Sequence, residues 1–330
     1  MTLDEMAKNL GVSKSTVSRA LSGKGRIGEA TRERIRSYAG EQGARILRQE
    51  DGNEGKTGNL GVVFPADVYE NLNPYFQDCL LGICEAATLM DYHVLLAIAT
   101  ASDISGIQAL VEKKKVDGII LTRNLDHDKA VKYLTDIGFP AGMTGQCDRE
   151  EVIQVDTDNE GAAEHLTSLL IGRGFRRFAF VVEDLSYRVD RNRYDGFCTA
   201  LLKNGISREK QAFYVGNVKV DLLDSVIGDM ISKKVECIIC GDDVICTRIV
   251  SRLQAEGYRI PKDIAVASLY NSSNLNCFSP QITAVSISAR QMGNMIGKQM
   301  INRLRGKGYE TKVIMDYEIL FRKSTNRGYT

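Results

Sequence analysis

Residues 2–35 read TLDEMAKNLGVSKSTVSRALSGKGRIGEATRERI, and this stretch decides the fold of the N-terminal part. Apolar residues recur there at helical spacing, namely Leu3, Met6, Ala7 and Leu10. Thr2 is placed to cap the helix that they define. Gly11 can take the left-handed conformation that ends this helix and turns the chain. The pattern predicts a first short helix followed by a tight turn.

A second helix is predicted to begin at Ser13, whose hydroxyl can accept hydrogen bonds from backbone N–H groups two and three residues later. One face of this helix is apolar and contains Val17, Ala20 and Leu21. The opposite face is polar and cationic and carries Lys14, Ser15, Ser18, Arg19 and Ser22. A third helix, over residues 29–42, is expected to bury Ile35, Tyr38 and Ala39.

Three short helices with a glycine turn between the first two predict a helix-turn-helix. A recognition helix must pack one face on its partner and offer hydrogen-bonding and cationic side chains to the major groove. The charge distribution agrees, since residues 1–48 carry ten basic and five acidic groups while the whole chain has a net charge of +1. The alternative is a small helical bundle with an ordinary solvated polar face.

Gly11-Val12-Ser13 together with Thr16-Val17-Ser18-Arg19 closely resembles the headpiece of the lactose-repressor/galactose-repressor family of transcription regulators. The resemblance implies that the second helix enters the major groove of double-stranded operator DNA. It implies base contacts from Lys14, Ser15 and Arg19. It also implies contact with, or support of, the phosphates by Thr2, Ser13, Thr16, Ser22, Arg26 and Thr31, with Ser22 in place of the usual asparagine.

The segment that follows, residues 44–58, is polar and glycine-rich and is typical of a linker. The family normally has a hinge helix here, entered through Pro-Asn, with a leucine that wedges into the minor groove. This chain has Leu47 but no Pro-Asn, and Glu50, Asp51 and Glu54 would be repelled by phosphates. We therefore expect a flexible linker rather than a hinge that wedges and bends DNA.

Beyond residue 59 short apolar runs alternate with helical patterns, which predicts parallel α/β architecture. The expected strands are residues 60–64, 93–98, 118–121, 152–155, 178–182, 237–240 and 264–269. The expected helices are residues 75–90, 105–115, 127–137, 160–173, 191–204, 222–233 and 244–256. Two units of this kind fit into the length, with a crossing near residues 156–160.

This body resembles the effector-binding core of the same family, itself similar to periplasmic sugar-binding proteins. Matching segments include VDTDNEGA at 155–162, GRGFRRFAFV at 172–181 and RYDGFCTAL at 193–201. The fold class expected is α/β, with an N-terminal three-helix, lambda-repressor-like helix-turn-helix headpiece and two Rossmann-like lobes of periplasmic-binding-protein-like type. The resemblance further implies a homodimer, a palindromic operator and later crossings near Ile287 and Asp316.

These expectations set the domain boundaries. The headpiece is placed at 1–43 and the linker at 44–58. The first sensor lobe is placed at 59–158 plus 288–315, and the second at 159–287 plus 316–330.

A ligand of such a protein is expected at the carboxyl ends of the strands, between the lobes. Arg193 matches the family arginine that reaches into the cleft, although a surface arginine at a helix start is the alternative. Tyr75 and Phe76 either stack on an apolar ligand face or pack in the core. Asp242 and Asp243 follow a strand, where they either accept hydrogen bonds from ligand hydroxyls or cap the next helix.

Tyr270 departs most clearly from the family's sequence pattern, because Leu269-Tyr270-Asn271 stands where the family usually has Phe-Asp-Asp. Tyr270 is therefore included among the expected effector contacts, and a simple hexose is less secure as the ligand. A modified sugar, a nucleoside-like compound and a ligand with an amine facing Asp242 all stay open. The expected function is a cytoplasmic repressor whose operator affinity a small, sugar-like effector controls; the alternative is a solute-binding protein with no role in transcription.

Several function classes have little support in the sequence. No nucleotide-binding glycine loop or zinc motif occurs, and the three histidines lie in no catalytic pattern, so neither a cofactor nor an enzyme is expected. No apolar run is long enough for a membrane span, and no secretory signal precedes the headpiece. The sulfurs of Cys237 and Cys240 should diverge, because residues three apart on a strand face opposite sides.

Overall fold

The computed structural model describes residues 3–13, 16–17, 20, 27–35, 37–38, 56–66, 73–216 and 220–328. Contacts divide the chain into two units, Met1–Lys56 and Thr57–Thr330. Within the described residues, no helix combines the length and the apolar character that a membrane crossing requires.

The first unit begins with the predicted helix α1, Leu3–Leu10. Gly11 follows it with a positive φ of 64°, as its position predicted, and the N–H of Val12 then donates to the carbonyl of Ala7 at 3.0 Å. Val17, Ala20 and Ile35 are completely buried against Met6 and Ala7. The apolar face predicted for the second helix thus packs on the first and third helices, in the residues that the structure describes.

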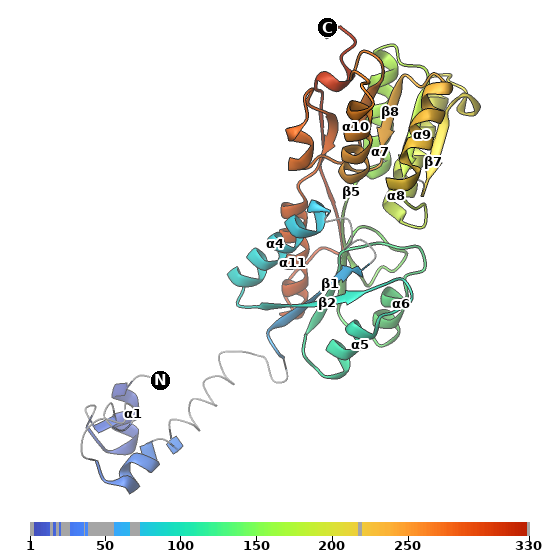
Figure 1. The fold of residues 1–330 in the computed structure, drawn as a ribbon. Coiled ribbons are helices and arrows are strands. Elements are labelled where there is room, and N and C mark those ends of the chain that lie inside the picture. Colours follow the sequence, from blue (N-terminus) through green and yellow to red (C-terminus); the bar gives the residue numbers. More distant parts are fainter. Residues whose placement is uncertain are drawn as a thin grey trace. The chain divides into compact units, whose positions relative to one another are not determined.

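The second unit contains two six-stranded sheets (Figure 1). The first sheet has the order β11-β5-β4-β3-β1-β2, and all of its pairs are parallel. Its strands are β1 Asn59–Pro65, β2 His93–Ala99, β3 Gly118–Leu121, β4 Ala141–Thr144, β5 Ile153–Thr157 and β11 Lys312–Met315. Helices α4 Pro74–Leu89 and α11 Ala289–Leu304 pack on one face, and α5 Ser105–Glu112 and α6 Lys129–Asp136 pack on the other.

The second sheet has the order β12-β10-β9-β8-β6-β7, and only its β10–β12 pair is antiparallel. Its strands are β6 Phe178–Val182, β7 Ala212–Val215, β8 Cys237–Cys240, β9 Ala265–Ser268, β10 Thr283–Ser286 and β12 Glu318–Leu320. Helices α7 Asn159–Gly172 and α8 Arg188–Lys203 cover one face, and α9 Val220–Ser232 and α10 Asp243–Ala255 cover the other. The α/β prediction with two parallel-sheet lobes is confirmed.

The chain passes from one sheet to the other between β5 and α7, between β10 and α11, and between β11 and β12. We call the unit around the first sheet the first lobe and the unit around the second sheet the second lobe. Three connections between two compact lobes allow the lobes to move against each other about a narrow region.

Close packing of α4 on α11 holds the first lobe together, and the two helices lie side by side in Figure 1. A Cβ atom at Gly82 would overlap the backbone oxygen of Arg290, and one at Gly293 would overlap that of Cys79. Glycine at both positions lets the two backbones come this close. Helix α11 and strands β4, β7, β10, β11 and β12 were not among the elements that the sequence predicted.

Buried cysteines take part in packing in the second lobe. Cys237 lies in the core beside α7 and α8, whereas Cys240 lies in the core beside α9 and α10. Their predicted divergence is confirmed. Among the described residues no group of three or more His, Cys, Asp or Glu side chains is arranged to hold a metal ion.

Candidate functional site

A cavity of about 510 Å³ lies between the two lobes of the second unit. The first lobe contributes residues after β3 and β4, including Asn124 and Gly145. The second lobe contributes residues after β6, β8 and β9, including Asp184 and Tyr270. The cavity therefore lies at the carboxyl ends of parallel strands, where ligands of open α/β sheets bind.

Arg193, on α8, lines this cavity with a side chain that is buried rather than on the surface. The residue is only 7% exposed, and its Nη1 donates to the carbonyl oxygen of Gly241 at 2.8 Å. This bond fixes the guanidinium against the end of β8. The alternative of an ordinary surface arginine does not fit this position.

Three carboxylates line the cavity beside Arg193, two of them buried (Asp156 and Asp190) and one half-buried (Asp242). Burial raises the pKa of Asp156 to about 6 and that of Asp190 to about 7, and it also raises the pKa of Asp242. In each case the positive charge of Arg193 lowers the pKa, but not enough to offset the loss of hydration. Asp156 is further held by Asn159, whose Nδ2 donates to its Oδ1 at 3.1 Å.

Asp242 caps the next helix, one of the two roles that its sequence position left open, and its position also leaves it facing the cavity. It is the N-cap of α10, since its Oδ1 accepts from the N–H of Ile245 at 2.8 Å, and it also lines the cavity. Asp243 does not line the cavity. Its side chain is fully buried and accepts a hydrogen bond from the hydroxyl of Ser272, so it braces the loop after β9.

Aromatic side chains form one wall. Tyr75 meets Tyr270 edge to face at 5.8 Å between ring centroids and meets Phe76 in the same way at 5.3 Å. All three line the cavity, and the hydroxyl of Tyr75 lies 3.2 Å from the sulfur of Met292. Desolvation raises the pKa of Tyr75 well above its usual value, so its hydroxyl stays protonated. Asn271, next to Tyr270, instead accepts from Nη1 of Arg322 at 2.9 Å.

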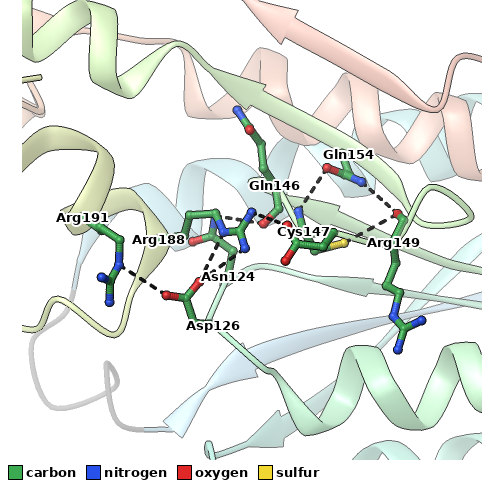
Figure 2. A network of polar contacts seen from close by, with 9 residues as sticks. Asn124, Asp126, Gln146, Cys147, Arg149, Gln154, Arg188 and Arg191 are labelled. Atoms are coloured by element: carbon green, nitrogen blue, oxygen red, sulfur yellow. Dashed lines mark hydrogen bonds and ion pairs between the residues drawn. The ribbon is translucent and has the colours of Figure 1, made fainter. Parts of the chain in front are cut away.

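At the edge of the cavity the two lobes are tied together directly (Figure 2). Leu125 of the first lobe and Tyr187 of the second form an antiparallel bridge. On either side of it the N–H of Asp126 donates to the carbonyl of Ser186, and the N–H of Arg188 donates to that of Asn124, both at 3.2 Å.

Charged side chains extend this link. Nη1 of Arg188 donates to Oδ1 of Asp148 at 2.9 Å, and its Nη2 lies 3.3 Å from Oδ1 of Asp126. Arg191 pairs with the other oxygen of Asp126 at 3.3 Å (Figure 2). The pKa of Asp148 is lowered, chiefly by its hydrogen bond from Arg188. We call the residues Asp126, Asp148, Arg188 and Arg191 the interlobe clasp.

Sequence reasoning did not select several residues that line the cavity, including Asn124, Asp156, Asn159, Tyr187 and Asp190. Asn124 and Asp156 lie at the ends of buried strands, which is the signal that identified Asp242. Asp190 carried no such signal, because it lies in the first turn of α8 and its proximity to Asp242 depends on the arrangement of the whole lobe.

In the first unit three of the predicted DNA-contacting residues are described. Ser13 caps the second helix as predicted, with its Oγ accepting from the N–H of Thr16 at 3.2 Å. The N–H of Thr31 donates to the carbonyl of Gly28 at 3.0 Å, in the first turn of the third helix. The other predicted contacts lie outside the described residues: Thr2, Lys14, Ser15, Arg19, Ser22 and Arg26. The same holds for Leu47 of the linker.

Comparison with known families assigns both units. Residues 2–43 match the model of bacterial regulatory proteins of the lacI family, and residues 167–325 match that of a periplasmic binding protein-like domain. The chain belongs to the LacI family. It is a DNA-binding transcriptional regulator with a helix-turn-helix headpiece and a binding-protein-like sensor, as predicted from the sequence.

Several proteins are similar to this chain along most of its length. The transcriptional regulator MalR of Staphylococcus xylosus is 27% identical over 93% of this LacI-family chain and 92% of its own. A transcription regulator-like protein of Staphylococcus haemolyticus is 26% identical with a TM-score of 0.75, over 82% of this chain and all of its own. A complex of the regulator CelR with cellobiose has a TM-score of 0.73 at 23% identity, over 98% of this chain and 99% of its own. The family consists of transcriptional regulators rather than enzymes.

Proposed function

We propose that this LacI-family regulator is a cytoplasmic repressor that binds a palindromic operator as a homodimer. A small, carbohydrate-like effector bound between the lobes controls its affinity for DNA. The observation that carries the proposal is the cavity in which Arg193 stands among Asp156, Asp190 and Asp242. Its volume of about 510 Å³ is in the range of pockets that enclose small ligands.

The lining suits a hydroxylated ligand of this kind. A guanidinium donates two hydrogen bonds in parallel, and carboxylates accept from hydroxyl groups. Tyr75, Phe76 and Tyr270 offer ring faces and edges to the apolar side of a sugar ring. The similarity to a regulator solved with cellobiose supports the same chemical class.

For DNA recognition we propose base contacts from Lys14, Ser15 and Arg19. Thr2, Ser13, Thr16, Ser22, Arg26 and Thr31 would contact or support the phosphates. The buried Val17 and Ala20 support this assignment, because they fix which face of the second helix is left for DNA.

Exposed apolar side chains support the homodimer. Leu96 and Ile98 on β2, an edge strand of the first sheet, are 57% and 55% exposed, and Leu89 on α4 is 76% exposed. Apolar surface gathered at the edge of a sheet marks an interface with another chain. A two-fold dimer would present two headpieces to the two halves of a palindrome.

The proposed domain boundaries are 1–43 for the headpiece, 44–58 for the linker, 59–158 plus 288–315 for the first lobe, and 159–287 plus 316–330 for the second. An effector that changes the angle between the lobes would change the spacing of the two headpieces. Operator half-sites have a fixed separation, so this change alters the affinity for DNA.

Thermal-shift and calorimetric screening of the full chain against a panel of sugars and nucleosides tests the sensor site. Arg193→Ala should weaken binding of any hit by roughly tenfold or more, since it removes a charged, buried hydrogen-bond donor. Arg252→Ala is the matched control, because Arg252 pairs with Asp224 outside the cavity lining. Equal affinity in wild type and Arg193→Ala would remove Arg193 from the site.

A further inference from the structure

The described lining of the cavity between the lobes contains more carboxyl than guanidinium side chains. Among the described residues that line it, five carry carboxylates and three carry guanidinium groups. The carboxylates are Asp156, Glu183, Asp184, Asp190 and Asp242, and the arginines are Arg123, Arg193 and Arg248. A neutral sugar needs only a few of these groups to bind its hydroxyls, so the surplus requires another explanation.

One of the three arginines does not offset the carboxylates in the cavity. Nε of Arg123 lies 3.5 Å from Oδ2 of Asp128, and both side chains are almost completely buried. The guanidinium also donates to the carbonyls of Ala99 at 3.3 Å and Thr100 at 2.6 Å. Asp128 is not part of the cavity lining, so the charge of Arg123 is balanced on the side away from the cavity.

Among the described residues of the lining, Arg193 and Arg248 are therefore the cations that act on the carboxylates. Arg193 acts on Asp156, Asp190 and Asp242, and Arg248 acts on Asp242. Asp242 in turn repels Asp190, and desolvation leaves the pKa of Asp190 raised to about 7. Buried carboxylates that lack full compensation favour any added positive charge within a few ångströms.

A second observation points into the cavity independently of charge. Oδ2 of Asp156 is buried and accepts no hydrogen bond from the described part of the chain, although the residue is only 6% exposed. Buried polar atoms are normally paired, so this oxygen faces a donor that a ligand would supply.

Aromatic rings complete the arrangement. Tyr75, Phe76, Tyr187 and Tyr270 line the same cavity as the carboxylates. Ring faces attract cations through their quadrupole, and protein sites for ammonium groups combine aromatic rings with acids. The asparagines Asn124 and Asn159 leave donors and acceptors for hydroxyl groups.

We propose that the effector is a small polyhydroxylated molecule that carries a protonated amine, and that the amine is held between Asp190, Asp242 and the aromatic wall. This inference rests on the proposed function, because it concerns the same cavity. It narrows the effector from carbohydrate-like molecules in general to their cationic, amino-bearing members.

The first test needs no knowledge of the effector. The nitroxides aminomethyl-PROXYL, a cation, and carboxy-PROXYL, an anion, differ chiefly in charge. The measured quantity is the NMR relaxation rate of a methyl group with the cation divided by its rate with the anion at equal concentration. For the methyl groups of Val189 and Val244, in the cavity lining, this cation-to-anion ratio should be at least about three. Leu202, 81% exposed on α8, is the reference, and its ratio should lie near one. A ratio at or below one at both cavity residues overturns the proposal.

Two variants tie the ratio to specific carboxylates. Asp190→Asn and Asp242→Asn should each lower it, and asparagine also preserves the helix cap at position 242. Asp136→Asn is the control, because Asp136 is an exposed carboxylate on α6 outside the lining. A ratio that is unchanged in both cavity variants would overturn the assignment to these residues.

The second test measures the affinity for d-glucosamine, d-glucose and d-glucuronate. These sugars have the same pyranose ring but are cationic, neutral and anionic, respectively. The amine should bind at least about tenfold tighter than glucose, and Asp190→Asn should reduce that preference. Tighter binding of glucose or glucuronate overturns the proposal; if none of the three binds, the nitroxide ratio decides. If a neutral sugar binds in the cavity and changes the affinity for the operator, the proposal of a cationic effector is refuted and the proposed function stands.

Discussion

Arg188 Nη1 and Asp148 Oδ1 lie 2.9 Å apart, and the two residues belong to different lobes. The same guanidinium reaches Asp126, so one side chain of α8 joins two loops of the first lobe. The contact lies at the edge of the proposed effector cavity. The interlobe clasp therefore stabilises the arrangement in which the lobes close over the cavity.

Loss of Arg188 should loosen this arrangement by a modest amount. Ion pairs near the surface each stabilise by about 0.2–1 kcal/mol, and Arg188 makes two, so Arg188→Ala should increase opening of the lobes by roughly two- to thirtyfold. Hydrogen exchange at the amides of Asp126 and Arg188, which bond across the lobes, should accelerate accordingly. Higher salt should accelerate exchange in the wild type more than in the variant.

Arg252→Ala provides the comparison, because Arg252 pairs with Asp224 inside the second lobe. Exchange at Asp126 and Arg188 should not change in that variant. If Arg188→Ala also leaves these amides unchanged, the clasp does not govern lobe opening.

The two glycines between α4 and α11 should tolerate no side chain. Gly293→Ala places a Cβ against the backbone of Cys79, so we expect the free energy of unfolding to fall by about 1–3 kcal/mol. Gly228→Ala, in an open part of α9, should instead be neutral or stabilise by up to about 1 kcal/mol. Urea denaturation followed by circular dichroism compares them, and equal effects would show that α4 and α11 can separate at no cost.

Some helices and strands of the lobes could be predicted from the sequence, and others could not. Strands β3, β6 and β8 were predicted with their observed ends because they are short, apolar and wholly buried. β11 and β12 escaped prediction because every residue in them is partly or fully exposed and neither forms a continuous apolar run. α11 carries glycines and polar residues along its length, and its partner α4 is about 200 residues away in the chain.

Some residues of the cavity could be predicted from the sequence, and others could not. Arg193 was selected from its match to the family arginine and Asp242 from its position after a strand, and both line the cavity. Asp243, the next residue, is the first residue of α10 and accepts a hydrogen bond from Ser272 instead. Asp190 could not be found, since it meets Asp242 only after β6 and β8 pair.

The stability of the lobed unit should fall as the pH rises through neutrality. Burial raises the pKa of Asp190 to about 7, so the folded state holds a proton that the unfolded state has released. Stability from this group is complete below about pH 4 and is lost as the pH approaches and passes about 7. Asp190→Asn should therefore reduce the difference in unfolding free energy between pH 5 and pH 8.

Urea denaturation at these two pH values measures the effect. Burial also raises the pKa of Asp156 and Asp243, so part of the dependence should persist in the variant. An unchanged pH dependence in Asp190→Asn, with Asp136→Asn as the control, would contradict the assignment to Asp190.

The headpiece should depend strongly on Ile35, which is completely buried in a core of few side chains. Ile35→Ala should cost about 2–4 kcal/mol, a large part of the stability of a unit this small. Operator binding should fall by more than about tenfold, while the thermal transition of the lobed unit stays in place. Glu33→Ala, an exposed position on the same helix, should not lower the stability of the headpiece. Full operator binding by Ile35→Ala would show that this core is dispensable.

The proposed repressor function requires above all that residues 14–22 bind DNA in a sequence-specific way. Selection from random duplexes with the purified full chain, followed by fluorescence anisotropy at moderate salt, tests it directly, in the presence and absence of candidate effectors. We expect an inverted repeat that binds two protomers at least about 1,000-fold tighter than scrambled DNA. Arg19→Ala should weaken that complex by about 1–3 kcal/mol and change binding to scrambled DNA far less. Sequence-specific binding through residues 14–22 would be contradicted if no duplex is enriched. It would also be contradicted if Arg19→Ala and wild type bind the enriched duplex equally well.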